Sequence, residues 1–543
     1  MKMTASEAIL NIILENGTDV VFGYPGSAIA PVYDALSRFD KIKHVLPKTE
    51  QSAAHAASGY AKSSGKVGVC IATSGPGATN LITGIATAYS DSVPMIAITG
   101  QVHSDLVGRD AFQEVDITGA TNPFCKHNYL INSPDEIVDV LREAFYIAST
   151  GRKGPVVIDI PTNYLTETVE FTKYKEPNLI SYKPNYKGNT LQIKRAIDCL
   201  KKAKRPLLYI GGGCCDKETN KELKKFIEKT NIPAVTTLKA VGAVPFDYPL
   251  NFGMIGTHGK KAANYALSTC DTLMILGARI GDRSLGKADL IDEENIKVIH
   301  IDIDPAEIGK NMHTNIPVVG LVKNVLSALN EKDFSVSCDK EWIEALKIKN
   351  SIKNDYPHKD GFVNPEYVIE CINRITNGES IVSTEVGQNQ IWAARNIKIN
   401  SPLGFITSGG LGTMGFGLPA AIGAAFANKN KTVIAIEGDG SLMMSLAELS
   451  TISTYNLNIK IVLFNNNALG MIREYQKNNF GENYFEVFLE KNPDFTLLAK
   501  SFGIEAKRVS NQEEIENALK EAFSYDGSYL IEINVDPMEN SII

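Results

Sequence analysis

The sequence has 543 residues, of which 44% are hydrophobic and 22% charged, and its formal net charge is −7. This composition is ordinary for a soluble globular protein, and the length predicts two to four domains because one core rarely serves so long a chain. No long basic run is present, so we expect neither a nucleic-acid partner nor a membrane partner. The eight cysteines show no CxxC spacing, which favours reduced thiols and a cytoplasmic location.

The start of the chain predicts a helix and not a secretory signal. Thr4 and Glu7 have the spacing of a capping box, and the apolar stretch that follows is short and interrupted by polar residues. The longest weakly polar stretch, Gly409 to Ala427, contains many glycines and a proline. We expect a buried loop and helix there, and not a membrane span.

The first block, residues 1–170, alternates apolar strands with helical patterns. This alternation predicts a parallel, doubly wound sheet. The expected strands are 20–23, 67–73, 95–99 and 156–160, and the expected helices are 52–64, 81–90 and 135–148. Residues 171–188 are predicted to form a linker, because they are rich in Lys, Pro, Asn and Tyr.

Two further blocks repeat the alternation, separated by a polar segment at 331–360. The expected strands are 206–210, 233–237, 272–276 and 298–303 in the second block, then 381–383, 432–436, 459–464 and 529–535 in the third. The predicted fold class is therefore α/β, with three doubly wound parallel-sheet domains at residues 1–170, 189–335 and 361–543.

A strand, a tight turn and a helix meet at Gly438-Asp439-Gly440. The next 24 residues fit one helix and one strand, and that strand leads to Asn465-Asn466. Because ligands bind where parallel strands end, Asp439 and Asn466 are expected to lie side by side at that edge. Their oxygens suit a divalent ion that takes its other ligands from phosphate and water. A plain strand–turn–helix with an Asp N-cap is the alternative, and the spacing to the double Asn disfavours it.

Glu50 stands between a predicted strand, residues 44–47, and an Ala-rich helix. Its position alone leaves two interpretations open: a surface carboxylate favoured by the helix dipole, or a buried proton relay. The glycine-rich run 409–417 lets the backbone pass close to a flat ring. Met414 within it, taken alone, fits a plain core methionine.

Several longer motifs resemble the large, catalytic subunit of the acetolactate (acetohydroxyacid) synthases, which use thiamine diphosphate. The resemblance runs through nearly the whole chain. The matching segments are GYPGSAIAPVYDAL (23–36), TEQSAAHAASGYA (49–61), ATSGPGATNLITGIATAYSDSVPMIAITGQV (72–102), GRDAFQEVD (108–116), IDIDPAEIGKN (301–311) and TSGGLGTMGFGLPAAIGAA (407–425).

The resemblance implies an activity and a set of partners. The enzymes decarboxylate pyruvate and join the hydroxyethyl unit to a second 2-oxo acid, giving 2-acetolactate or 2-aceto-2-hydroxybutyrate for branched-chain amino acid biosynthesis. Thiamine diphosphate, Mg²⁺ and a structural FAD are the implied cofactors, and the cofactor does the organic chemistry. The cofactor lies between the first domain of one subunit and the third domain of another, so a homodimer or homotetramer is implied, with a small regulatory subunit as a further possible partner.

The resemblance also assigns residues. Glu50 is the carboxylate that activates the cofactor, and Phe112, Gln113 and Gly26 shape the reaction pocket. The metal ligands are Asp439, Asn466 and the backbone oxygen of Ala468. Thiamine diphosphate contacts are assigned to Gly412, Met414, Val386, Gln388, Asn389, Gly440 and Ser441, and FAD contacts to His258, Arg279 and Asp302. Arg283 holds the carboxylate of the second substrate, and Tyr475 lines the acceptor site.

The chain departs from the family pattern at four places. Asn389 replaces a His, Thr257 replaces a Met, and Ile280-Gly281 replace Phe-Asp. Tyr475 stands where the family has a Trp that packs on the second substrate and favours 2-oxobutyrate over pyruvate. These changes leave the identity of the acceptor substrate undetermined, and a keto sugar is an alternative to a 2-oxo acid.

Other interpretations remain open at this point. A pyruvate-oxidase-type enzyme would pass electrons to the flavin, whereas a non-catalytic homologue would be expected to lack Glu50, Asp439 or Asn466. The middle domain could be structural and empty of FAD. Arg283 could form a surface ion pair with Asp282 or Asp289.

Overall fold

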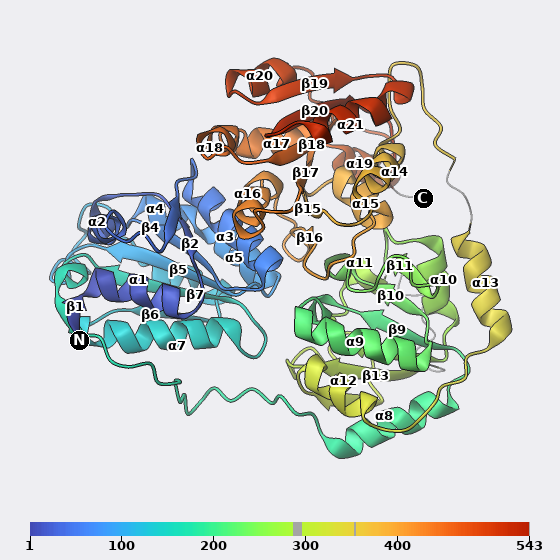
Figure 1. Ribbon diagram of the computed structural model, residues 1–543, viewed down its shortest axis with the longest axis horizontal. Coiled ribbons are helices and arrows are strands. Elements are labelled where there is room, and N and C mark those ends of the chain that lie inside the picture. Colours follow the sequence, from blue (N-terminus) through green and yellow to red (C-terminus); the bar gives the residue numbers. More distant parts are fainter. Residues whose placement is uncertain (286–295, 352–354, 542–543) are drawn as a thin grey trace.

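Three six-stranded parallel sheets form the frame of the protein in the computed structural model, which describes residues 1–285, 296–351 and 355–541 (Figure 1). Helices cover both faces of each sheet. The observed architecture confirms the predicted α/β class with three doubly wound sheets. No helix in these described ranges is long and apolar enough to span a membrane.

The first sheet has the strand order β3-β2-β4-β5-β7-β6. Helix α1 begins after Thr4, whose capping box with Glu7 is present as predicted. The strands are β2 (Val20–Gly23), β3 (Lys43–Val45), β4 (Gly68–Ala72), β5 (Met95–Gln101), β6 (His127–Leu130) and β7 (Pro155–Pro161); the main helices are α1 (Ala5–Glu15), α2 (Ala30–Leu36), α3 (Glu50–Ser64), α5 (Ile82–Ser90) and α7 (Ile137–Ser149).

The central sheet has the order β11-β10-β9-β12-β13-β14, so its strands run third, second, first, fourth, fifth, sixth along the chain. This is the order of dinucleotide-binding sheets, and its switch point lies between β9 and β12. The elements are α8 (Thr190–Lys202), β9 (Pro206–Ile210), α9 (Lys217–Thr230), β10 (Ala234–Thr236), β11 (Asn251–Met254), α10 (Lys261–Thr269), β12 (Thr272–Leu276), α11 (Asp282–Leu285), β13 (Lys297–Asp302), β14 (Ile316–Val319) and α12 (Val322–Asn330).

The third sheet, β16-β15-β17-β18-β20-β19, repeats the connectivity of the first: second, first, third, fourth, sixth, fifth. Its switch point lies between β15 and β17. The elements are α14 (Pro365–Thr376), β15 (Ile381–Thr384), α15 (Gln388–Asn396), β16 (Phe405–Ile406), α16 (Gly417–Ala427), β17 (Val433–Gly438), α17 (Asp439–Ser445), α18 (Glu448–Thr454), β18 (Ile459–Asn465), α19 (Gly470–Phe480), α20 (Phe495–Ser501), β19 (Glu505–Val509), α21 (Ile515–Ser524) and β20 (Tyr529–Asn534).

Two sequence predictions were wrong about helices. The polar segment 331–360 contains helix α13 (Lys340–Asn350), which packs Trp342 and Leu346 into the central domain and leaves its lysines outside. The sequence analysis missed this helix because the segment is mostly polar and the apolar face of the helix is narrow. The single helix expected after Gly440 is two short helices, α17 and α18, separated at Leu446-Ala447.

The first and third domains pack together through α3 and α16, which approach so closely that side chains cannot fit between them. A Cβ atom on Gly59 would lie 2.0 Å from the Ala420 carbonyl oxygen, and one on Gly423 would lie 1.8 Å from the Ala56 carbonyl oxygen. Both positions require glycine for this close approach. The contact fixes the helix that begins with Glu50 against the third domain (Figure 1).

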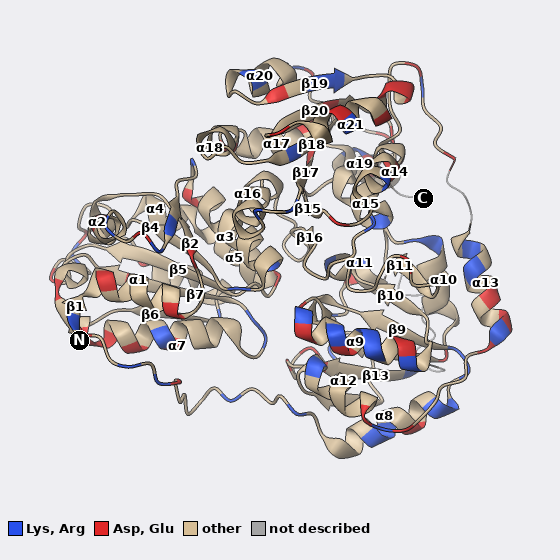
Figure 2. Ribbon diagram, viewed as in Figure 1, with Lys and Arg blue, Asp and Glu red and all other residues tan. Residues whose placement is uncertain are grey.

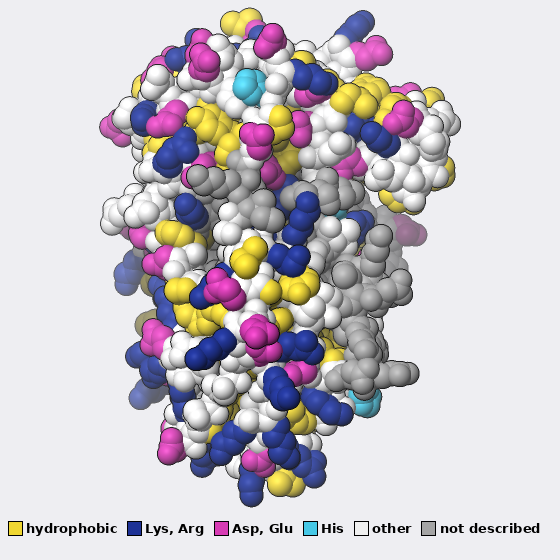
Figure 3. All heavy atoms as spheres, turned by 90° about the vertical axis from the view of Figure 1, so that its right-hand side faces the viewer, with side chains coloured by type: hydrophobic (Ala, Val, Ile, Leu, Met, Phe, Trp, Pro, Cys, Tyr) yellow, Lys and Arg dark blue, Asp and Glu magenta, His cyan; other side chains and the backbone are white. Residues whose placement is uncertain are grey.

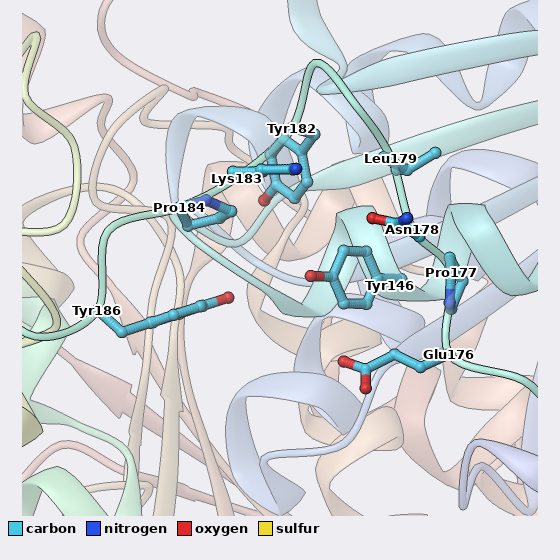
Figure 4. Close-up of a pocket in the computed structure, with 9 residues that line it drawn as sticks. All are labelled: Tyr146, Glu176, Pro177, Asn178, Leu179, Tyr182, Lys183, Pro184 and Tyr186. Carbon is cyan, nitrogen blue, oxygen red and sulfur yellow. The ribbon is translucent and has the colours of Figure 1, made fainter.

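The linker at 171–188 crosses the surface below α7 and encloses a small pocket of about 370 Å³ beside Tyr146, Tyr182 and Tyr186 (Figure 4). The Lys126 ammonium donates to the Tyr182 hydroxyl at 2.8 Å and fixes the linker there. Lysines cover the outer faces of α8 and α9 together with acidic residues (Figure 2). Basic side chains gather at the lower end of the face in Figure 3, where the central domain lies.

Asp159, on strand β7 of the first sheet, is expected to make the stability of this domain depend on pH. The carboxylate is 1% exposed, accepts from Thr99 and Gln101, and has a pKa raised to about 7 by burial. The pKa of an unfolded Asp is near 4, so between about pH 4 and 7 the folded state holds more protons. The free energy of unfolding therefore falls as pH rises through that window, by at most about 1.4 kcal/mol per pH unit.

The Asp159→Asn variant tests this dependence. Because Asn does not titrate, we expect the melting temperature of the variant relative to wild type to rise between pH 5 and pH 8. Differential scanning fluorimetry at both pH values measures the change, with exposed Asp34→Asn as the control. A difference between variant and wild type that stays constant with pH would contradict the assignment.

Candidate active site

The ends of β17 and β18 bring the predicted metal ligands to one edge. The two strands are parallel neighbours, with Gly438 opposite Phe464. Asp439 begins α17 and is 2% exposed. Its carboxylate accepts a 2.7 Å hydrogen bond from the Asn492 amide. Burial raises the pKa of Asp439 to about 6, a cost that a bound cation offsets.

The amide of Asn466 is held in one orientation. Its Oδ1 accepts from the backbone N–H of Ala468 at 3.1 Å, and its Nδ2 donates to Gln388 Oε1 at 2.9 Å. The described residues include no cluster of three or more His, Cys, Asp or Glu side chains suited to a metal. The candidate ligands at this edge are instead one carboxylate, one amide oxygen and one carbonyl oxygen. This set fits Mg²⁺, which accepts few protein oxygens together with phosphate and water.

The loop that follows β15 lies at the switch point of the third sheet, beside the GDG turn. Asn389 is 5% exposed, and its Oδ1 has no partner among the described groups. A Cβ atom on Gly438 would lie 2.6 Å from Asn389 Nδ2, so the amide passes directly over that glycine. Ser441 Oγ accepts from the Gly438 N–H at 3.2 Å. With the N-terminus of α15, these groups can donate to a diphosphate.

Two buried glutamates, Glu385 and Glu437, lie beside the glycine-rich run, and the sequence analysis predicted neither of them. Glu385 accepts from the N–H groups of Gly415 and Gly417 at 2.9 and 2.6 Å. Glu437 is fully buried, and neither of its oxygens has a partner among the described groups. Burial, and then the charge of Glu385, raise the pKa of Glu437 well above its ordinary value, so one proton is retained between the two.

The first domain presents a second edge at its own switch point, between β2 and β4. Thr49 caps α3, so that Glu50 is its first residue. The Glu50 carboxylate is half-buried and accepts from the Asn80 amide at 3.0 Å. Asn80 was not predicted, although it lies in a motif that resembles the family. Gly26 lies against Thr73, because a Cβ atom there would be 2.5 Å from the Thr73 methyl group.

Gln113 and Phe112 lie on the loop that follows β5. Gln113 has a positive φ of 62°, and it packs on Gly75, where an added Cβ atom would lie 2.8 Å from the Gln113 carbonyl oxygen. Phe112 is 88% exposed. Two other apolar residues next to the assigned site segments, Leu411 and Met444, are also exposed. No hydrogen bond between described groups joins Glu50 to Asp439.

A cavity of about 560 Å³ opens at the carboxyl edge of the central sheet, among all three domains. Arg279, Asp302 and Arg283 line it, together with glycines that follow β9 and β12. The Gly213 N–H donates to the Gly277 carbonyl at 2.9 Å across the switch point. A cleft at the switch point of a sheet with this order fits a dinucleotide.

The predicted flavin and acceptor residues divide between that cavity and its surroundings. Arg279 donates to the Ser90 carbonyl at 2.6 Å, and burial raises the pKa of Asp302 to about 6. His258 is not among the lining residues, and both its ring nitrogens lack a partner among the described groups. Arg283 is 72% exposed and 4.0 Å from Asp282; Asp289 lies outside the described residues. Tyr475, on α19, is 56% exposed.

Comparison with known proteins decides the family. Models of the N-terminal, central and C-terminal domains of thiamine pyrophosphate enzymes match residues 3–120, 193–329 and 385–533. The chain is 45% identical to the "Probable acetolactate synthase large subunit" of Methanocaldococcus jannaschii over 99% of this chain and 93% of that protein. It is 43% identical to the acetolactate synthase isozyme 2 large subunit of Escherichia coli and 40% identical to the acetolactate synthase large subunit of Haemophilus influenzae, each over 99% of this chain and 96% of the relative.

The chain belongs to the acetolactate synthase large-subunit family. The predicted resemblance is thereby confirmed, as are the enzyme class and the binding of thiamine pyrophosphate by the first and third domains. The roles of individual residues stay predictions.

In this synthase-family chain, a buried ionic junction links the three domains beside the central cavity. Asp91 is 4% exposed and lies 2.6 Å from Lys62 and 3.4 Å from Lys239. It also accepts from the N–H groups of Gly409 and Gly410 at 3.3 and 2.9 Å. Sequence reasoning missed this junction, because nothing in a single sequence pairs residues of three different domains. It fixes the start of the run that contains Gly412 and Met414.

Proposed function

We propose that this protein decarboxylates pyruvate and joins the two-carbon unit to a second 2-oxo acid, forming 2-acetolactate, as a step of branched-chain amino acid biosynthesis. The observation that carries the proposal is the edge at Asp439 and Asn466, where a buried carboxylate and an oriented amide lie beside a diphosphate-compatible loop. The printed names of the full-length relatives support the same activity.

The residues divide the work between the two edges. Thiamine diphosphate, when bound, supplies the nucleophilic carbon and accepts the electrons released with CO₂. Glu50, oriented by Asn80, holds and transfers a proton at the cofactor's ring. Asp439, Asn466 and the Ala468 carbonyl hold Mg²⁺, while Val386, Asn389, Gly440 and Ser441 donate to the diphosphate. Gly412 and Met414 position the ring against the glycine-rich run.

We assign a structural FAD to the central cavity. The strand order of the central sheet and the cavity volume of about 560 Å³ both suit a dinucleotide. Arg279 and Asp302 line that cavity, and His258 is proposed to act from its rim. The synthase reaction has no net redox change, so the flavin is expected to remain oxidised during turnover and its absorption spectrum to stay unchanged. Bleaching of the flavin by pyruvate without oxygen would instead support an oxidase.

Assembly from at least two copies is proposed because the cofactor of the synthases that this chain resembles lies between the first domain of one subunit and the third domain of another. Glu50 of one copy would face Asp439 of another, and the exposed Phe112 and Met444 would be covered there. We also propose a small regulatory subunit, since the relatives are named large subunits, and a cytoplasmic location. Domain boundaries near 170, 189, 335 and 361 accord with the strands of the three sheets.

A product assay tests the proposal. The purified protein receives thiamine diphosphate, Mg²⁺, FAD and pyruvate, and CO₂ and acetolactate are measured together. We expect equal amounts of the two. CO₂ without acetolactate would reject the acceptor and lead to keto sugars and aldehydes. Absence of CO₂, also after addition of a small subunit, would reject the proposed activity.

Tyr475 gives a prediction about the acceptor. In the family pattern a Trp at this position favours 2-oxobutyrate, and an indole presents a larger apolar face than a phenol. We therefore expect Tyr475→Trp to raise the preference for 2-oxobutyrate over pyruvate by about 10-fold, the effect of roughly one buried methylene or more. Competition between both acceptors measures the product ratio.

The control for this variant is Tyr525→Trp, which changes an exposed tyrosine at the C-terminal end of α21. An unchanged product ratio in Tyr475→Trp, with activity retained, would remove Tyr475 from the acceptor site.

A further inference from the structure

The segment that follows β20, Met538 to Ser541, is held by side chains although it forms no strand. Its backbone carbonyl oxygens all accept hydrogen bonds from buried donors. These are Arg473 to Met538 (3.2 Å) and to Glu539 (2.5 Å), Gln388 to Glu539 (2.7 Å), Trp392 to Asn540 (3.3 Å) and Arg395 to Ser541 (2.9 Å). Four carbonyl groups satisfied in this way fix the segment's position.

Glu474 closes this arrangement from α19. It is 4% exposed and accepts from the Ser541 N–H at 2.5 Å and from the Ser541 hydroxyl at 3.1 Å. The same carboxylate accepts from Gln388 Nε2 at 2.5 Å. The two N–H bonds of the Gln388 amide therefore point to Glu474 and to the Glu539 carbonyl, so both are used within the chain.

The orientation of Gln388 determines the orientation of Asn466. With Nε2 directed at Glu474 and Glu539, Oε1 faces Asn466 Nδ2 at 2.9 Å. With Nδ2 held by Gln388, Asn466 Oδ1, the proposed metal-ligand atom, points away from Gln388 and accepts from the Ala468 N–H at 3.1 Å. Gly470 makes room for the Gln388 amide in this position, because a Cβ atom there would lie 1.8 Å from Gln388 Oε1.

We propose that Gln388 is a positioning residue for the metal site, and that the segment 538–541 together with Glu474 holds it in place. The chain of contacts runs from the segment through Gln388 to Asn466 and so to Mg²⁺. This inference rests on the proposed Mg²⁺–thiamine diphosphate site. Groups that orient a metal ligand typically change metal affinity by about 10- to 100-fold when they are lost.

The first test is Gln388→Met, which keeps the length of the side chain and removes its amide. Mg²⁺ binding is titrated at saturating thiamine diphosphate by tryptophan fluorescence, with Trp392 reporting from within the network. We expect the Kd of Mg²⁺ to rise about 10-fold or more. The control is Gln476→Met on α19, whose amide also uses both its donor and its acceptor, toward Phe485.

The second test shortens the chain. A variant ending at Pro537 is expected to raise the Kd of Mg²⁺ as much as Gln388→Met does, whereas one ending at Ser541 keeps the wild-type Kd. Adding Gln388→Met to the shorter variant should not raise the Kd of Mg²⁺ further, because both changes act through the same amide. Additive effects, or a wild-type Kd in folded Gln388→Met, would overturn the proposal.

A third measurement needs no variant. Coupling between two sites is reciprocal, so Mg²⁺ with thiamine diphosphate must slow hydrogen exchange at the Ser541 amide of the wild-type protein. Unchanged exchange with bound Mg²⁺ would overturn the inference alone. Failure of the wild-type protein to bind Mg²⁺ and thiamine diphosphate at all would instead reject the proposed function.

Discussion

The Glu50→Gln variant is expected to lose about 10²- to 10⁴-fold in turnover, the usual contribution of a positioned proton-transfer group. Gln keeps the size of the side chain and can still bond to Asn80, but it cannot exchange a proton with the cofactor's ring. Binding of thiamine diphosphate and Mg²⁺ should remain, because the diphosphate and the metal are held in the third domain. Turnover and cofactor affinity are therefore measured on the same preparation.

Two further variants make this result specific. Glu50→Asp keeps the carboxyl group and shortens its reach, so an intermediate loss is expected. Glu170→Gln changes an exposed carboxylate at the end of β8 (Thr168–Glu170) and should leave turnover unchanged. Full activity in Glu50→Gln, or loss of cofactor binding with it, would contradict the proton-transfer role.

The sheets were predictable because buried parallel strands have a clear sequence pattern. The strands at 206–210 and 272–276 begin and end where the apolar runs predicted. Helix α13 was missed because only Trp342 and Leu346 of its eleven residues are buried. The sequence pattern of a charged helix with a narrow apolar face is hard to distinguish from that of a polar linker.

The candidate site was predictable as far as strand ends determine it. Asp439 and Asn466 follow neighbouring parallel strands, so their edge follows from the pattern alone. The contacts that support them were not predictable. Asn492 reaches Asp439 from 53 positions away, and Gln388 meets Glu539 from 151 away. Such side-chain pairs depend on the packing of whole elements, which a single sequence does not specify.

The shared strand order of the first and third sheets gives these observations a common cause. In each sheet the strand order reverses between the first and third strands, and the candidate residues lie there: Gly26 in one, Val386 and Asp439 in the other. A ligand whose two ends differ in chemistry can be held between two such edges. The diphosphate end needs a metal and backbone N–H groups, and the ring end needs a single proton-transfer group.

Asp439→Asn is expected to have the second large effect, with two opposite consequences. The loss of the only carboxylate in the proposed ligand set should raise the Kd of Mg²⁺ by about 100-fold or more and abolish turnover at ordinary Mg²⁺ concentrations. In the metal-free protein the same change should stabilise the fold. Burial raises the folded pKa of Asp439 to about 6, so ionising it costs stability progressively between about pH 4 and 6 and in full above that.

The sign of the stability change therefore depends on Mg²⁺. At pH 8 without metal, Asp439→Asn should melt at a higher temperature than wild type, since a neutral amide replaces a buried charge. With Mg²⁺ and thiamine diphosphate, wild type should gain stability by mass action and the variant should not. Asp494→Asn, at an exposed helix cap, is the control and should respond to Mg²⁺ as wild type does. If Asp439→Asn lowered the melting temperature equally with and without Mg²⁺, Asp439 would be a structural cap and not a metal ligand.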